Sequence, residues 1–246
     1  TTSVLMCHDP ERAVTRRALL ATGAAVAAGA LAPAPLLAAL DASSSSMRGG
    51  RGAPAPSTPD KALRALVDGN ARFVAGRAAA PNRDPARLRA LADTQRPFAA
   101  FLGCADSRVP IEIVFDQGFG DVFPVRVAGN IVTSEVTGSL EYACVELGAK
   151  VLMVLGHAGC GAVKATIGGA PVPGLIGSLY QHIAPAVDRA GNDLAAAVRE
   201  NVRIQAGLLR RSPVLNGLVR ERKLAIVGGV FDLATGRVTL VDDGRA

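Results

Sequence analysis

Hydrophobic and polar residues change their spacing several times after residue 58, and each spacing predicts a different element. From Thr58 onward, apolar side chains recur every three or four residues between Leu63 and Phe73. This spacing predicts an amphipathic helix, with Thr58 or Ser57 as its cap and Pro59 in its first turn. Three short continuous apolar runs predict buried strands. These runs span residues 98–102, 122–127 and 151–155.

Segments long enough for helices separate and follow these three strands. The C-terminal part predicts a strand over residues 224–231, a turn at Ala234, Thr235 and Gly236, and an edge strand over residues 238–241. Strands that alternate with helices predict an α/β fold, here a single domain whose central β-sheet is mainly parallel and flanked by helices. Helices are predicted over residues 84–93, 134–147, 176–190 and 194–211.

The N-terminal segment lacks the pattern of a folded domain. Arg16 and Arg17 stand directly before an alanine-rich, weakly hydrophobic stretch that runs to about Leu40, and a segment rich in Gly, Pro and Ser follows. This layout is typical of a twin-arginine export signal with a linker behind it. We therefore expect residues 1–57 to be signal and linker, and residues 58–246 to form the folded domain.

The expected signal also predicts a location and a partner. The twin-arginine export machinery would carry the folded protein to a periplasmic or extracellular location. If the signal were not cleaved, the protein would stay tethered to the membrane. Pro33 and Pro35 interrupt the hydrophobic stretch, which argues against a permanent membrane-spanning helix.

Composition excludes several classes of protein. With 246 residues, 49% of them hydrophobic, the chain can build a full core. The net charge is +6, but only 4% of residues are aromatic and no basic stripe alternates with them, so we expect no nucleic-acid partner. The four cysteines, Cys7, Cys104, Cys144 and Cys160, are too few and too unevenly placed for a disulfide scaffold. Metal binding or catalysis is the favoured use of Cys104 and Cys160. We interpret Cys7 as a residue removed with the N-terminal segment, and Cys144 as a small buried hydrophobic residue.

Two of the three central strands end in residues for which a hydrophobic core has no use. Cys104, Asp106 and Arg108 follow the first strand, and His157 and Cys160 follow the third. The carboxyl ends of strands form the ligand crevice of an open α/β sheet, so we expect the two segments to converge. Two thiolates and one imidazole suit tetrahedral zinc, and three protein ligands leave a fourth position for water, as in catalytic zinc sites.

Simpler interpretations of these residues stay open at this point. A single cysteine or histidine at the end of a strand is usually a packing residue, and Asp106 with Arg108 could be a surface ion pair that contributes little. A redox dithiol is a further alternative, but neither segment has the spacing of a Cys-x-x-Cys motif.

Cys104-x-Asp106-Ser107-Arg108 together with His157-x-x-Cys160 resembles the paired signature of the β-class carbonic anhydrases. The similarity covers roughly residues 60 to 241, and it includes residues 123–130, 138–142 and 155–157. It implies one Zn²⁺ per subunit and reversible hydration of carbon dioxide to bicarbonate and a proton, by attack of a zinc-bound hydroxide. It also implies a homodimer or a dimer-based tetramer, in which the N-terminal helix packs on a partner subunit.

The resemblance further implies roles for the residues around the zinc. Asp106 would orient the hydroxide by accepting its hydrogen bond, while Arg108 holds the Asp106 carboxylate. Without that hold, Asp106 would move onto the zinc as a fourth ligand, which defines a closed state of the site. Gln95, nine positions before Cys104, matches a glutamine that donates to the substrate oxygen in one subgroup. The backbone amide of Gly161 is a further candidate donor, and an apolar pocket is expected from Phe123, Ala128 and Tyr142, the last contributed across the dimer interface.

Two other functions would use the same residues. One is hydrolysis of carbonyl sulfide or carbon disulfide, which differs from carbon dioxide hydration in the shape of the access channel. The other is binding of zinc or bicarbonate without turnover, against which the intact pair of Asp106 and Arg108 argues. No histidine is well placed as a proton shuttle, since His8 lies in the expected signal and we interpret His182 as a structural residue of a helix.

Overall fold

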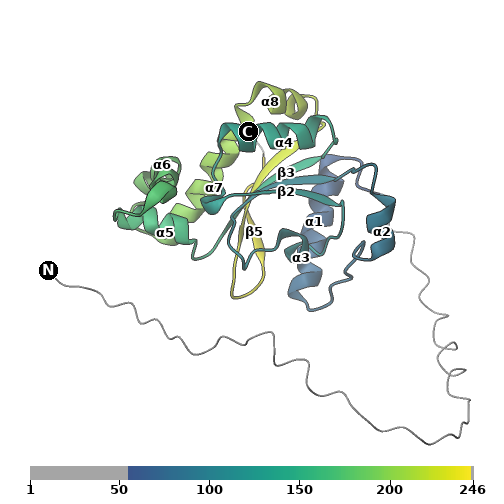
Figure 1. Ribbon diagram of the computed structural model, residues 1–246, viewed down its shortest axis with the longest axis horizontal. Helices are drawn as coiled ribbons and strands as arrows, with labels where there is room; N and C mark the ends of the chain where they lie inside the picture. The colour runs from purple at the N-terminus through teal and green to yellow at the C-terminus, as the bar shows by residue number, and fades with distance from the viewer. Residues whose placement is uncertain (1–54, 245–246) are drawn as a thin grey trace, which may run out of the picture. The chain divides into compact units, whose positions relative to one another are not determined.

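The computed structural model describes residues 55–244, and these form a five-stranded sheet in the order β2-β1-β3-β4-β5 (Figure 1). The first four strands are parallel, and β5 is antiparallel to β4. The predicted α/β fold with a mainly parallel sheet is therefore confirmed. The predictions for the signal segment and Cys7 lie outside the described residues. The strands are β1 (Ala99–Gly103), β2 (Val122–Arg126), β3 (Val151–His157), β4 (Ala225–Phe231) and β5 (Val238–Asp242).

The helices follow the predicted pattern, with short additions. They are α1 (Pro59–Val74), α2 (Pro85–Ala90), α3 (Ile111–Val114), the 3₁₀ helix η1 (Ala128–Asn130), α4 (Ser134–Val145), α5 (Gly161–Gly168), the 3₁₀ helix η2 (Gly174–Leu179), α6 (Tyr180–Ala190), α7 (Leu194–Arg210) and α8 (Pro213–Arg220). The α-helix predicted from residue 176 begins only at Tyr180, because Gly174 and Gly177 disfavour a regular α-helix before it. No helix in residues 55–244 is long and apolar enough to cross a membrane.

Polar side chains determine where several helices begin. Thr58, one of the two predicted caps of α1, accepts a hydrogen bond from the Lys61 amide at 3.4 Å. Asp193 accepts the amides of Ala195 and Ala196 at the start of α7. A cap of this kind satisfies backbone donors that have no partner inside the helix.

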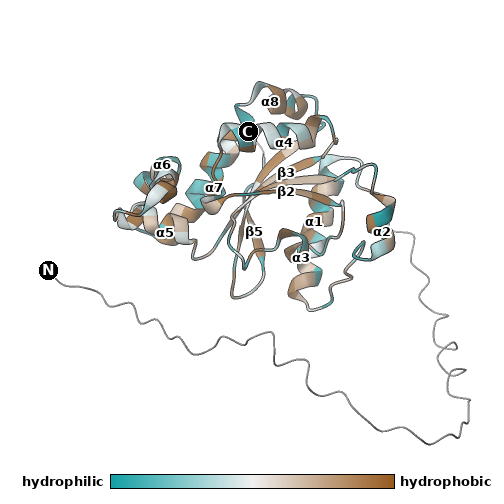
Figure 2. Ribbon diagram, in the orientation of Figure 1, coloured by the Kyte–Doolittle hydropathy of each residue, from teal (hydrophilic) through white to brown (hydrophobic). Residues whose placement is uncertain are grey.

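Helices cover both faces of the sheet, because successive side chains of each strand point to opposite faces. Ala99 and Phe101 of β1 face a core that α1 and α3 complete, whereas Ala100 and Leu102 face a core completed by α4, α7 and α8. Figure 1 shows α1 and α3 on one side of the sheet and α4 and α8 on the other. The strands between these layers carry mostly the hydrophobic colours of Figure 2.

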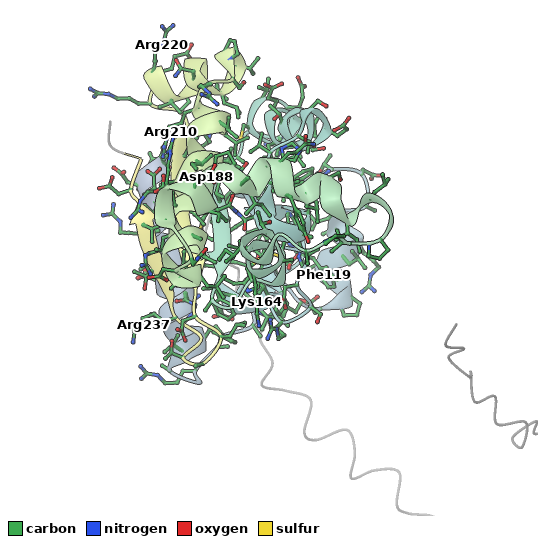
Figure 3. All side chains as sticks on the ribbon, turned by 90° about the vertical axis from the view of Figure 1, so that its left-hand side faces the viewer. Phe119, Lys164, Asp188, Arg210, Arg220 and Arg237 are labelled. Carbon is green, nitrogen blue, oxygen red and sulfur yellow. The ribbon has the colours of Figure 1, made fainter. Side chains whose placement is uncertain are left out.

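The edge strand β5 is tied to α7 by one arginine. Arg210, labelled in Figure 3, donates to both carboxylate oxygens of Asp242 at 2.7 Å and to the carbonyl oxygen of Ile226. Bidentate pairs of this kind combine charge with fixed geometry. The pair thus ties the C-terminal end of α7 to the edge of the sheet formed by β4 and β5.

Candidate metal centre

The strand order creates a crevice at the carboxyl ends of β1 and β3. The connection after β1 leads to β2 on one side, and the connection after β2 crosses to β3 on the other side, so the order of the strands reverses between β1 and β3. Such a switch point leaves the loops after the two strands free to flank a ligand. Gly103 of β1 pairs with Leu155 of β3, so Cys104 and His157 emerge at nearly the same level. The predicted convergence of the two segments is confirmed.

Cys104, His157 and Cys160 bring their donor atoms together within this crevice. The two sulfurs and one ring nitrogen all lie within 4.8 Å of one another, and all three residues are buried. Ligands at about 2.0 to 2.3 Å from one tetrahedral zinc stand roughly 3.5 to 4 Å apart. The group therefore has the right donors and a suitable separation for one zinc ion.

One ring nitrogen of His157 has no hydrogen-bond partner in the part of the chain that the structure describes, which indicates that it binds a metal ion. Nδ1 of the ring lies 3.0 Å from the carbonyl oxygen of Ala158, which fixes the orientation of the ring. Its Nε2 is fully buried and has no hydrogen-bond partner among the described residues. A buried polar atom without a partner is costly, and a metal ion is the natural acceptor of an imidazole lone pair held in this way.

The two thiols compete for a single negative charge. The neighbouring Cys160 thiol lowers the pKa of Cys104, although burial acts in the opposite direction. The same contact, together with burial, raises the pKa of Cys160. Because metals bind thiolates, a divalent cation between the sulfurs would allow both to ionise. The chemistry of the donor set thus fits zinc.

Asp106 and Arg108 form the predicted pair beside these donors. Arg108 donates from Nε to Asp106 Oδ1 at 2.9 Å and from Nη2 to Oδ2 at 2.8 Å, and its backbone amide also donates to Oδ1. Hydrogen bonds from Arg108 hold the pKa of Asp106 well below its usual range. Asp106 Oδ2 lies 3.8 Å from His157 Nε2, so an ionised carboxylate stands directly beside the donor group.

Arg126 and Gly129 support this site, and the sequence motifs alone did not assign them a role. Arg126 donates from Nε to the carbonyl oxygen of Cys104 at 3.0 Å and from Nη2 to that of Asp106 at 2.6 Å. The amide of Gly129 donates to the Cys104 sulfur at 3.4 Å. An arginine within an otherwise apolar strand was the one sequence signal that could have indicated Arg126.

The predicted substrate-binding residues are more spread out. Gln95 and Tyr142 line a surface hollow of about 800 Å³ to which none of the three metal donors contributes. The Phe123 ring packs against the α4 side of the core and lies 6.3 Å from the Tyr142 ring. Ala128 begins η1, and the exposed Gly161 begins α5, where an amide has no acceptor within its helix. A single chain thus leaves Gln95 and Tyr142 apart from the donor group.

Cys144 and His182, for which the sequence predicted structural roles, both lie outside the metal group. Cys144 lies on α4 and is buried in the core, and burial raises its pKa to about 12, as expected for an inert thiol. His182 lies on α6, where its carbonyl oxygen accepts a hydrogen bond from Gln205, and its ring lies beside Gln181. Neither residue belongs to the metal group.

Comparison with known proteins agrees with this geometry. The sequence model of the family described as carbonic anhydrase matches residues 99–238, which include all three donors and the pair of Asp106 and Arg108. The chain belongs to the carbonic anhydrase family. It is 41% identical to a carbonic anhydrase of Mycolicibacterium smegmatis over 194 residues, which is 75% of this chain and 94% of that protein. It is 40% identical to carbonic anhydrase 2 of Mycobacterium tuberculosis over 196 residues, which is 75% of this chain and 93% of that protein.

Solved structures assign the class within the carbonic anhydrases. A Coccomyxa β-carbonic anhydrase in complex with acetazolamide superposes with a TM-score of 0.58 at 27% identity, over 72% of this chain and 85% of that one. A β-carbonic anhydrase from Sordaria macrospora, described as tetrameric, shares the fold with a TM-score of 0.60 at 24% identity, over 75% of this chain and 98% of that one. The predicted β class, enzyme activity and Zn²⁺ cofactor are confirmed.

Proposed function

We propose that this carbonic anhydrase converts carbon dioxide and water reversibly to bicarbonate and a proton at the zinc site of Cys104, His157 and Cys160. Hydration of carbon dioxide in general follows from the family. The assignment to these residues rests mainly on one observation, the buried donor group whose atoms lie within 4.8 Å of one another. The ionised Asp106 beside it supports a catalytic rather than a purely structural site.

Zinc bound there would act as a Lewis acid that brings the pKa of a water molecule to about 7, a value established for carbonic anhydrases in general. Asp106 would accept a hydrogen bond from the O–H of the attacking water. This would orient a lone pair of the water oxygen toward the carbon of carbon dioxide. Because Arg108 keeps the Asp106 pKa low, the carboxylate stays an acceptor at neutral pH. The Gly161 amide and the Gln95 side chain would donate to the oxygens of the substrate.

Arg108 would have a second task, which is to keep Asp106 off the metal. It occupies both carboxylate oxygens with charge-assisted hydrogen bonds. These hydrogen bonds support an open arrangement of the pair as the resting state. A closed arrangement, with Asp106 as fourth ligand, would require both bonds to Arg108 to break.

We also propose that the site is completed in a homodimer or a dimer-based tetramer. Tyr142 is 49% exposed and Phe119 is 43% exposed, and both line the hollow that contains Gln95. Large apolar side chains gathered around one hollow are typical of a surface that a protein partner covers. A second copy placed there would bring Tyr142 toward the neighbouring site, as predicted. Packing of α1 on a partner subunit stays a prediction.

Stopped-flow measurement of carbon dioxide hydration, with zinc content determined on the same sample, tests the proposed function. We expect about one zinc per chain, and we expect activity to disappear on removal of zinc by a chelator and to return when zinc is added back. Carbonyl sulfide and carbon disulfide should be measured alongside. Zinc-free protein with full activity, or hydrolysis of either sulfur compound faster than hydration of carbon dioxide, would contradict the proposal.

Export by the twin-arginine route remains our proposal for the N-terminal segment, based on Arg16 and Arg17 before the alanine-rich stretch. Changing both residues to lysine should retain the enzyme in the cytoplasmic fraction, whereas Arg12→Lys, a matched change outside the pair, should leave export unaffected. The measurement is carbonic anhydrase activity and immunodetection in separated cell fractions. Equal export of the double variant and the unaltered protein would refute this assignment.

A further inference from the structure

Two amide side chains of α7 are buried where the rest of that helix face is apolar. Asn201 is 1% exposed and Gln205 is fully buried, one helical turn apart. Their neighbours on the same face are apolar or small: Ala197, Val198, Val202, Ala206 and Leu209. Burying an amide is unfavourable unless its donors and acceptors all find partners, so this pair requires a specific explanation.

The hydrogen bonds of the pair determine how both amides are oriented. Gln205 Oε1 accepts the backbone amide of Val132 at 2.8 Å, so its Nε2 must be the donor to Asn201 Oδ1 and to the carbonyl oxygen of His182, each at 3.1 Å. Asn201 Nδ2 is then left to donate to the carbonyl oxygen of Gly129 at 2.9 Å. The two side chains thus hold the backbone of the loop after β2 at two points, Gly129 and Val132.

Gly129 connects this clamp to the metal donors. Its amide donates to the Cys104 sulfur, while its carbonyl oxygen accepts from Asn201. Its φ angle is +76°, a left-handed conformation that favours glycine, and a Cβ atom would lie 2.7 Å from Ile183 Cδ1. A side chain at position 129 would therefore be strained, and the hydrogen bond from Asn201 to the Gly129 carbonyl oxygen restrains this glycine in the conformation that directs its amide at Cys104.

We infer that Asn201, supported by Gln205, is a positioning residue of the zinc site. By holding Gly129, it aims a backbone N–H at the sulfur of Cys104, and this hydrogen bond stabilises the thiolate that binds the metal. Hydrogen bonds to metal ligands orient them and tune their donor strength, and their loss typically weakens metal binding about 10- to 100-fold. Asn201 itself is not expected to touch zinc or substrate.

A purely structural role for the pair would give a different result. If Asn201 and Gln205 served only to stabilise the loop, loss of Asn201 would make the protein less stable and would leave zinc binding unchanged. A positioning role predicts a specific effect on the metal. Leu209→Ala offers the matched control, because Leu209 is fully buried on the same helix face but contacts the core beside α8 rather than the metal loops.

Zinc affinity measured by competition with a chromophoric chelator tests the inference. We expect Asn201→Ala to bind zinc about 10- to 100-fold more weakly than the unaltered protein, and to shift the thiolate-to-metal absorption band of the cobalt-substituted protein. Leu209→Ala should unfold at a lower temperature and keep the zinc affinity and the cobalt spectrum unchanged. Unchanged affinity and spectrum in Asn201→Ala, or an equal loss in Leu209→Ala, would overturn the inference.

A further measurement guards against a variant that does not fold. In the unaltered protein loaded with an NMR-active isotope of cadmium, the Gly129 amide proton should show scalar coupling to the metal through the Cys104 sulfur. Lack of that coupling would contradict the inference without any substitution. The inference rests on the proposed zinc site, and unaltered protein that binds no zinc would instead refute the proposed function.

Discussion

Replacing Cys104 with serine is expected to abolish zinc retention and carbon dioxide hydration together. Serine has almost the same size, but its hydroxyl stays protonated at neutral pH and is a poor ligand for zinc. Sites that use all four positions bind zinc with about 10 to 16 kcal/mol, so losing one ligand should weaken binding by about two orders of magnitude or more. Zinc content after dialysis and stopped-flow hydration measure the two effects on one sample. His157→Ala should behave in the same way.

Cys144→Ser is the matched control for this experiment. Cys144 is as buried as Cys104 but lies on α4, in a core that does not include the donor group. The same chemical change there should cost some stability, because it buries a hydroxyl, and should leave zinc content and turnover intact. If Cys104→Ser retained its zinc, or if Cys144→Ser lost it to the same degree, the donor set would be wrong.

Replacing Asp106 with alanine is expected to separate metal binding from catalysis. Arg108 holds both Asp106 oxygens, so the carboxylate is free of the metal group in this structure and its loss should leave about one zinc per chain. Turnover should fall by about 100-fold, since the attacking oxygen would lose the acceptor that orients it. The comparison of kcat with zinc content on the same preparation gives the result.

A surface ion pair of the same spacing provides the control. Glu221 and Lys223 are two residues apart, as Asp106 and Arg108 are, and their charged atoms lie 2.7 Å apart, but both side chains are more than half exposed. Glu221→Ala should therefore leave turnover and zinc unchanged. Arg108→Ala should also reduce turnover, because Asp106 would then be free to move onto the metal. Full activity in Asp106→Ala would refute the proposed role of the Asp106 carboxylate.

Much of the fold follows from local patterns. The helical spacing after Thr58 and the three apolar runs correspond closely to α1, β1, β2 and β3. The short helices α3, α5 and α8 were not predicted. Each has eight residues or fewer, and α5 and α8 contain glycine, so their local signal is weak and tertiary packing, for α5 and α8 mainly against other helices, stabilises them instead.

For the site, the sequence by itself determined the donor types and their places after β1 and β3, because a cysteine or histidine that follows a buried strand is recognisable along the chain. Only the tertiary structure decided which groups hold those donors. Gly129 and Asn201 are 72 positions apart in the chain, yet they share a hydrogen bond of 2.9 Å. Contacts of this kind arise when α7 packs onto the sheet, and no periodicity in either segment encodes them. The physical reason is that hydrogen-bond geometry depends on distances set by packing, whereas residue spacing reports only local backbone conformation.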